Sequence, residues 1–396
     1  MIILLQTIFW LSIFFLFYNY VGYAIVTWVL IKLSSKRRAY DYDVDAPGVT
    51  MIIAAYNEES FVEQKILNTL ALDYPKDRLQ VIFITDGSTD STPDIIRNYP
   101  EIELLHKSER SGKTAALNRA VPYAKYGILV MCDANTMLNK DCIKELAKHY
   151  QDETIGAVAG EKKVLSADGL TKQEGLYWKY ESALKKLDAT YQTIVGAAGE
   201  LFSLRKNLWQ HVEEDTILDD FMISMRIVQQ GYRVHYEPRA YATETASASV
   251  KEEAKRKVRI AAGGFQSMAR LLPMLNIFRH GKSSFLYISH RVLRWAVCPF
   301  CLVLLLLSSL ALFFVSDQLI FKIAFVMQVF VYGLMILNSV LSPKGVKIPV
   351  IQPLQYFVFM NICVIRGFFR YMKGEQSATW ERAQRQILQE AAEINR

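Results

Sequence analysis

Residues 127–136 read GILVMCDANT, an apolar run that ends in a short polar stretch. The apolar part has the length and composition of a strand buried on both faces. Asp133 follows this run at once, and Asn135 comes two residues later. Because α/β proteins place ligands at the carboxyl ends of parallel strands, the stretch predicts either a polar turn or one edge of a nucleotide and metal site.

The same arrangement recurs through the first half of the chain. Apolar segments alternate there with segments of helical spacing, at residues 49–55, 79–85, 101–106, 127–132 and 155–160. Strand–helix alternation with fully apolar strands predicts an α/β fold, with a Rossmann-like parallel sheet covered by helices on both faces. Further helices are expected at about 171–189, 219–230 and 250–270.

The amino terminus has the features of a membrane anchor. Residues 2–31 carry no charge, and Lys32 and the basic residues 36–38 follow. This length suffices to cross a bilayer as a helix, and the basic flank predicts that the following domain is cytoplasmic. We therefore expect a transmembrane anchor at 1–31, uncleaved, and a basic and polar linker at 32–48.

The carboxyl-terminal part is also rich in apolar segments. Two spans are expected at about 297–315 and 319–341. A third stretch, 350–369, contains Asn361 and Arg366, so it could span, re-enter or lie in the interface.

The predicted organisation of this part has three units. They are an amphipathic interfacial segment at 271–294, a transmembrane region at 295–372 and a polar tail at 373–396. The formal charge is +7, and its basic residues gather beside apolar segments. This placement favours a lipid bilayer as the anionic partner and argues against nucleic acid. We expect a multi-pass protein of the cell (plasma or inner) membrane.

Polar side chains follow each of the first four predicted strands. They are Tyr56 and Glu58, then Asp86, then Lys113, then Asp133 and Asn135. Each one alone is compatible with a turn or a helix cap. Because the carboxyl ends of parallel strands meet at one edge, the set predicts a site for a polyanionic ligand and a divalent cation.

Two common nucleotide-binding motifs are excluded. Residues 111–114 read SGKT, but a phosphate loop needs a glycine where Lys107 stands. No GxGxxG fingerprint is present either. The chain is therefore neither a P-loop ATPase or GTPase nor a conventional dinucleotide-binding protein.

A second group of acids lies at Asp215, Asp219 and Asp220. Asp219 and Asp220 fall in the first turn of the helix expected at 219–230. Capping and the helix dipole explain one of the pair. The other is available as a general base.

An ordered series of motifs now resembles the membrane-embedded family-2 glycosyltransferases, the group of cellulose, hyaluronan and poly-N-acetylglucosamine synthases. The series is AAYNEE (54–59), DGSTDST (86–92), SGKTAALN (111–118), CDANT (132–136), VGAAGELFSLRK (195–206), LDDF (218–221) and RKVRI (256–260). It covers about residues 49–270, which we take as the boundaries of a cytoplasmic catalytic domain. The resemblance implies a GT-A-type domain inserted between transmembrane helices, with interfacial helices.

The same resemblance implies roles for individual residues. It implies an inverting transfer from a nucleotide-sugar donor, here a UDP-sugar, to a growing exopolysaccharide or lipid-linked acceptor. Asp220 would be the general base, and Asp133 with Asn135 would hold Mg²⁺ or Mn²⁺ on the diphosphate. Tyr56, Glu58, Asp86, Lys113 and Asp133 would bind the nucleotide. Asp219, Arg256 and Arg259 would lie at the diphosphate or the acceptor.

Two positions depart from the family's pattern. Asn135 replaces a carboxylate and is a poorer ligand for a hard cation. Ile260 stands where the synthases carry the tryptophan that stacks on the acceptor sugar, so processive polymerisation is in question and Tyr177 or Trp178 could contribute instead. A non-enzymatic alternative is a membrane-tethered nucleotide-sugar sensor. Polysaccharide-export partners are possible.

Overall fold

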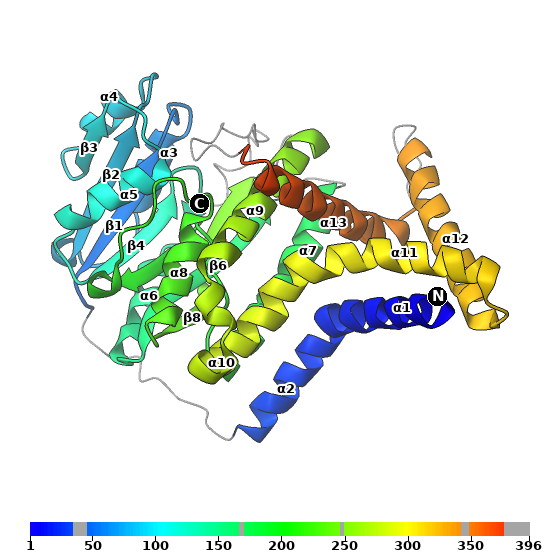
Figure 1. The fold of residues 1–396 in the computed structure, drawn as a ribbon. Helices are drawn as coiled ribbons and strands as arrows, with labels where there is room; N and C mark the ends of the chain where they lie inside the picture. The colour runs from blue at the N-terminus through cyan, green and yellow to red at the C-terminus, as the bar shows by residue number, and fades with distance from the viewer. Residues whose placement is uncertain (35–45, 166–169, 246–248, 342–347, 376–396) are drawn as a thin grey trace.

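The computed structural model describes residues 1–34, 46–165, 170–245, 249–341 and 348–375. An α/β domain forms one end of the molecule, and long helices from both termini project from it (Figure 1). Residues 35–45 of the predicted linker and 376–396 of the predicted tail lie outside the described residues.

A single eight-stranded sheet organises the domain, in the order β3-β2-β1-β4-β7-β6-β8-β5. The strands are β1 Val49–Ala55, β2 Leu79–Asp86, β3 Glu103–Lys107, β4 Ile128–Asp133, β5 Met137–Leu138, β6 Ile155–Leu165, β7 Phe202–Arg205 and β8 Arg233–Thr245. β3, β2, β1 and β4 are parallel neighbours. β7 runs antiparallel to both β4 and β6, while β6 and β8 are parallel.

The five strands expected from the sequence all run in one direction, but the sheet is mixed rather than wholly parallel, because a further strand was not expected. β7 lies between β4 and β6 and reverses the direction. β7 has only four residues, too few to show a period. β8 contains Pro238, which normally argues against a strand, and its register with β6 shifts between Gly160 and Glu161.

Helices cover both faces of the sheet, as predicted. The domain's helices are α3 Val62–Leu70, α4 Thr92–Arg97, α5 Lys113–Ala120, α6 Cys142–Ala147, α7 Leu170–Tyr191, α8 Asp219–Gln229 and α9 Val250–Arg270, with short 3₁₀ turns at Lys76–Arg78, Val121–Tyr123, Lys148–Gln151 and Lys206–Leu208. Along β1 the side chains alternate between two cores. Met51 and Ile53 pack with Ile66 of α3, and Ile52 packs with Ala116 of α5.

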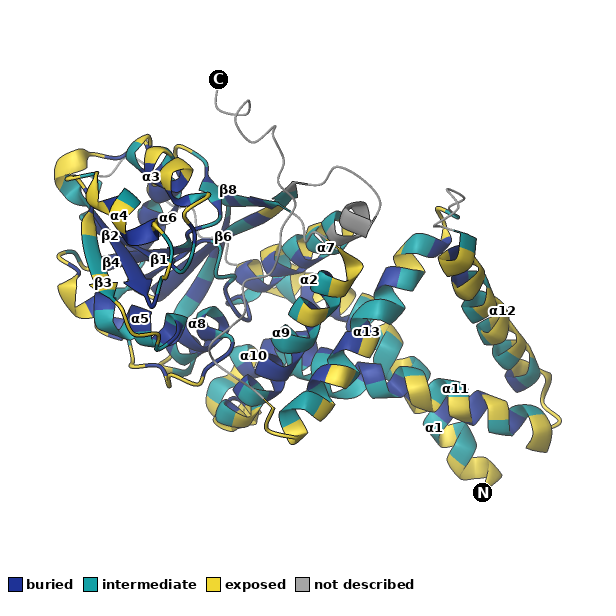
Figure 2. Cartoon of the chain, turned by 90° about the horizontal axis from the view of Figure 1, so that it is seen from above, coloured by how far each residue is buried: buried dark blue, intermediate teal, exposed yellow. Residues whose placement is uncertain are grey.

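The remaining helices form the other end of the molecule. They are α1 Ile2–Phe17, α2 Tyr23–Leu33, α10 Ile277–Tyr287, α11 Cys298–Val315, α12 Leu319–Leu341 and α13 Ile351–Met372, with a 3₁₀ turn at Leu272–Leu275 and π-helical segments at Tyr18–Gly22 and Ile288–Val297. Among the described residues, three continuous stretches are long and apolar enough to cross a membrane, namely Ile2–Leu33, Ile277–Val315 and Leu319–Leu341. Many of their side chains are exposed (Figure 2).

Helix α13 contains the stretch 350–369, whose placement the sequence left open. It packs along α9 of the α/β domain. A Cβ at Gly367 would lie only 2.5 Å from that of Ala261, so the two helices cross in close contact. Phe368 packs edge-on against Phe265 of α9, at 5.1 Å between ring centres. This apolar stretch is thus a helix that packs against the α/β domain.

Candidate active site

Two of the predicted residues form the centre of the candidate site. Asp133 is the last residue of β4, and Lys113 is the first residue of α5. The Lys113 ammonium donates to Asp133 Oδ1 at 2.7 Å. Gly112 precedes Lys113 with a φ of 101°, a conformation that glycine adopts without strain. This turn directs Lys113 toward the end of β4.

The start of α8 brings the second acidic group to the same point. Asp219 Oδ2 lies 3.4 Å from the Lys113 ammonium. Gly199 closes the cluster, because a Cβ at this position would sit 3.2 Å from Asp220 Oδ2 and 3.5 Å from Lys113 Nζ. One lysine therefore faces three carboxylates, which we call the acidic cluster: Lys113, Asp133, Asp219 and Asp220.

Burial and the excess of carboxylates raise the pKa of two carboxyl groups in the acidic cluster. Burial raises the pKa of the Asp220 carboxyl, and the Asp219 charge adds to this, so that it reaches about 7. Burial also raises the pKa of Asp133, although Lys113 opposes that shift. Burial disfavours the Lys113 ammonium, yet the three carboxylates hold its pKa above the usual range. Asp220 is thus poised to take a proton near neutral pH.

Two oxygens at the cluster are buried without a hydrogen-bond donor among the described residues. They are Asn135 Oδ1 and Asp219 Oδ2, although the latter is within ion-pair distance of Lys113. Leaving such atoms unpaired is costly unless a ligand satisfies them. Asn135 follows Asp133 by two residues, and carboxylate and amide oxygens of this kind are donors that fit Mg²⁺ or Mn²⁺.

Asp86, the last residue of β2, contacts the loop that precedes Lys113. Its Oδ2 accepts hydrogen bonds from the backbone amides of Ser111 at 2.7 Å and Gly112 at 2.6 Å. Arg119 lies 4.0 Å from its other carboxylate oxygen. Asp86 therefore fixes the loop that leads into Lys113, in addition to any contact with a nucleotide.

Tyr56 and Glu58 lie at the end of β1, on the side of the site formed by the first strands. The Arg110 guanidinium stacks over the Tyr56 ring at 3.9 Å. Glu58 is only 8% exposed and follows Asn57, whose φ is 52°. Arg110 belongs to the polar residues expected at this edge of the sheet, but the sequence assigned it no individual role. Its only sequence signal is that it belongs to the polar segment after β3.

The two arginines of α9 have different surroundings. Arg259 is close enough to interact electrostatically with Asp219, Asp220 and Asp133, although burial lowers its pKa overall. Arg256 pairs with Glu253 at 3.2 Å and lies 3.9 Å from Glu244. The structure thus brings Arg259 toward the acidic cluster and pairs Arg256 with Glu253.

A further acid near the cluster was not singled out in advance. Glu200 forms an ion pair with the buried Lys162, which also pairs with Glu244. Its charge raises the pKa of both Asp220 and Asp133. Asp215, by contrast, is exposed and pairs with Arg270 at 2.6 Å, so it belongs to the surface.

The two aromatic residues proposed for the acceptor, Tyr177 and Trp178, pack edge-on against each other at 5.9 Å between ring centres. Tyr177 helps to line a cavity of about 270 Å³ between α7, α13 and the segment Ile288–Val297. Trp178 lies 5.1 Å from the Lys162 ammonium. Trp295, from that same segment, lines the cavity and packs against Phe221 at 5.4 Å, next to Asp220. This aromatic residue was missed because it lies far from Ile260 in sequence.

Comparison with known proteins identifies a domain within the chain. Residues 50–212 match the family described as Glycosyl transferase family 2. They form a family 2 glycosyltransferase domain. This glycosyltransferase domain contains Lys113, Asp133 and Asn135, whereas Asp219 and Asp220 lie beyond the matched residues.

Two similar curated proteins are named as synthases. The chain is 28% identical over 282 residues to a poly-beta-1,6-N-acetyl-D-glucosamine synthase of Staphylococcus aureus, covering 67% of this chain and 64% of that protein. It is 29% identical over 214 residues to the beta-monoglucosyldiacylglycerol synthase of a Nostoc species, covering 49% of this chain and 44% of that one. The chain thus spans less than two thirds of the length of these relatives.

A solved structure shares the fold over most of the chain. The mannosyltransferase PcManGT from Pyrobaculum calidifontis, in complex with GDP-Man and Mn²⁺, superposes with a TM-score of 0.69. The sequences are 21% identical, and the match covers 94% of this chain and all of that one. The glycosyltransferase domain therefore has the GT-A fold, here attached to three helices capable of crossing a membrane.

Proposed function

We propose that the glycosyltransferase domain transfers a sugar, with inversion, from a UDP-sugar to a hydroxyl of a glycan or lipid-linked acceptor at the membrane. The observation that carries this proposal is the Asp220 carboxyl, whose pKa is raised to about 7 beside the Lys113–Asp133 pair. A group with this pKa can accept a proton from an attacking hydroxyl at neutral pH.

The reaction would make one bond and break another. The acceptor oxygen bonds to the anomeric carbon of the donor sugar, on the face opposite the leaving group. The bond from that carbon to the phosphate oxygen breaks, and the nucleoside diphosphate leaves with the electron pair. Asp220 takes the hydroxyl proton. Lys113 and Arg259 are the cations placed to offset charge on the diphosphate.

A divalent ion fits this site. Asp133 and Asn135 would hold Mg²⁺ or Mn²⁺, and the ion would supply charge neutralisation for the leaving diphosphate. In the described part of the chain no three His, Cys, Asp or Glu side chains gather as a ligand set. The diphosphate would therefore provide part of the coordination. This agrees with Asn135 Oδ1, a buried oxygen without a hydrogen-bond donor among the described residues.

The acceptor and the membrane arrangement belong to the same proposal. One similar protein is named for a polymer of N-acetyl-D-glucosamine and another for a glucosylated diacylglycerol. Both products are compatible with a site beside membrane helices. The basic residues after Leu33 support a cytoplasmic domain in a multi-pass protein, by the positive-inside rule. Export partners remain a prediction.

The test is nucleotide diphosphate release by the full chain in detergent, with Mn²⁺ and a panel of nucleotide sugars. We expect one donor to be turned over, and Asp220→Asn to lower the rate by about 10²–10⁴-fold. Asp215→Asn is the matched control, since it removes an exposed carboxylate nearby. An Asp220→Asn variant as active as the control would disprove the base assignment. A wild-type chain that binds donors but turns none over would support the sensor alternative.

A further inference from the structure

A groove outside the acidic cluster is lined mainly by cations. It has a volume of about 680 Å³ and lies between α9 and α13, on residues not assigned to transfer. Its lining residues are Lys251, Ala254, Lys255, Val258, Arg366, Phe369, Arg370, Lys373 and Glu375. We propose that this groove, the basic groove, binds the phosphate of an anionic membrane lipid.

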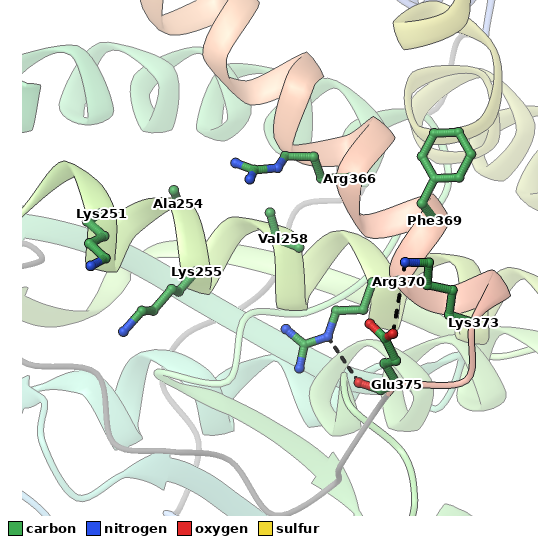
Figure 3. A pocket seen from close by; sticks show the side chains of 9 residues that line it. All are labelled: Lys251, Ala254, Lys255, Val258, Arg366, Phe369, Arg370, Lys373 and Glu375. Atoms are coloured by element: carbon green, nitrogen blue, oxygen red, sulfur yellow. Dashed lines mark hydrogen bonds and ion pairs between the residues drawn. The ribbon is translucent and has the colours of Figure 1, made fainter.

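The groove arises from how two amphipathic helices cross. At Gly367 the backbones of α9 and α13 are in close contact. A Cβ added to this glycine would lie 2.9 Å from the Val258 carbonyl oxygen. To one side of this crossing, each helix presents residues spaced i, i+3, i+4 and i+7, which form one helical face. Figure 3 shows the lining side chains of α9 and α13 on either side of the groove, with Arg366 extending between the helices.

The charges lining the groove are poorly balanced. Five lining side chains are cationic, and Glu375 is the single acid among them. Arg370 donates to the Glu375 carbonyl at 3.3 Å, and Lys373 lies 4.0 Å from its carboxylate. Lys255 pairs with Glu252 at 2.9 Å, whereas Arg366 and Lys251 have no ion pair with any residue in the described ranges. Gathering like charges in one groove is unfavourable unless an anion is bound.

The surroundings identify the anion as a lipid rather than a free phosphate. Val258 and Ala254 line the groove, and Phe369 beside them is 55% exposed. Helix α13 also touches a membrane-crossing stretch, because Phe368 packs on Phe300 at 5.4 Å. The groove thus has both apolar and cationic lining residues and lies near the predicted bilayer surface. A lipid with a phosphate headgroup and acyl chains requires both kinds of contact.

This arrangement would place a bound lipid against the helix that reaches the acidic cluster. Lys251, Lys255 and Val258 face the groove, while Arg259 of the same helix interacts with Asp219 and Asp220. A lipid in the groove would therefore help to fix α9. Binding itself does not depend on the transfer reaction.

The experiment measures binding of fluorescent short-chain phosphatidylglycerol to the full chain in detergent, without donor or metal. The groove variant is Arg366→Gln/Arg370→Gln/Lys373→Gln. Its matched control, Lys32→Gln/Arg279→Gln/Lys282→Gln, removes the same charge from exposed, membrane-proximal positions outside the groove. We expect about tenfold or greater weakening in the groove variant, and less than about twofold in the control. Short-chain phosphatidylcholine should not compete.

Three outcomes would overturn the proposal. The groove variant could bind as wild type, or both variants could weaken equally, which would show diffuse surface attraction. Inorganic pyrophosphate could also bind as tightly as the lipid, which would make the ligand a free phosphate. Arg366→Lys/Arg370→Lys keeps the charge and should retain binding, so loss of binding in the groove variant alone is not a folding defect. The assay needs no turnover, so it is independent of the proposed function.

Discussion

Two regions of this molecule bury several charges, and they balance them differently. In the acidic cluster, Lys113 faces Asp133, Asp219 and Asp220, and buried oxygens of Asp219 and Asn135 lack hydrogen-bond donors among the described residues. The second region, which we call the junction network, lies where α7 meets the helices of both termini. There the carboxylates are matched by cations and donors.

The junction network has two carboxylates. Glu181 pairs with Arg294 and with Arg291, the latter at 3.3 Å. Although burial opposes it, these guanidinium groups hold the pKa of Glu181 well below its usual range. Asp188 accepts from the Tyr23 hydroxyl and contacts the His290 ring. Further hydrogen bonds tie the network to α1, α13 and their connections, from Arg294 to Asn19, Asn19 to Ser289, and Tyr20 to Asn361.

The contrast separates a site from a support. In the junction network both carboxylates have partners, although His290 Nε2 makes no hydrogen bond among the described residues and lies 3.4 Å from Glu181. Buried ion pairs of this kind hold one arrangement of helices in place. A buried excess of negative charge raises carboxyl pKa values and creates demand for a cation. The acidic cluster thus has the electrostatics of a catalytic site, and the junction network has those of a structural joint.

The largest effect is expected from Asp133→Ala. This change removes the partner of Lys113 and one proposed metal ligand, so transfer should fall below about one hundredth of wild type. The fold should persist, because the cluster loses one of its repelling carboxylates. Donor turnover and thermal unfolding measure the two effects. Asp141→Ala, on an exposed carboxylate at the start of α6, is the control. If the Asp133→Ala enzyme stayed active without metal, the acidic cluster would no longer differ in role from the junction network.

The reverse pattern is expected for Glu181→Gln. It leaves Arg294 buried without its carboxylate, so the free energy of unfolding should fall by roughly 3–5 kcal/mol. Thermal or denaturant unfolding in detergent measures this, with the exposed Glu153→Gln as control. The fraction that stays folded should retain its turnover. A stable but inactive Glu181→Gln variant would instead make the junction network part of the catalytic machinery.

A pH dependence follows from Asp220. Transfer should increase as pH rises through about 7, because the base acts only after losing its proton. The stability of the folded chain without donor should instead decrease as pH rises. Folding raises this pKa, so the protonated form stabilises the folded chain, and that contribution is lost as pH rises through about 7. Rate profiles and melting temperatures at several pH values, compared with Asp220→Asn, test both directions. If the difference between wild type and Asp220→Asn did not change with pH, the burial of Asp220 would be contradicted.

The smallest effect is expected from Asn135→Asp. A carboxylate in place of the amide should tighten Mn²⁺ binding by about tenfold, because hard cations prefer charged oxygens. Transfer should persist, since Asp133 and Asp220 are unchanged. Mn²⁺ titration followed by electron paramagnetic resonance gives the affinity, and Asn139→Asp, which adds the same charge nearby, is the control. Unchanged Mn²⁺ affinity would show that position 135 does not contact the ion.

Much of the candidate site follows from local patterns. The apolar run 127–132 implied a buried strand, and Asp133 at its end was placed correctly because parallel strands present their carboxyl ends together. The helix start at Asp219 and the full extent of α9 also agreed with the predicted spacing. The reversed strand β7 escaped notice, since four residues between loops show no period.

The sequence by itself determined the periodic elements, the apolar spans and the polar residues at strand ends, because burial and hydrogen bonding within an element depend on near neighbours. Only the tertiary structure decided how charges are paired. Tyr23 meets Asp188 across 165 positions, Asp188 meets His290 across 102, and Gly199 closes on Asp220 through packing between separate elements. Such pairings depend on how helices and sheet dock, and the identity of a charged residue does not reveal whether it will be balanced.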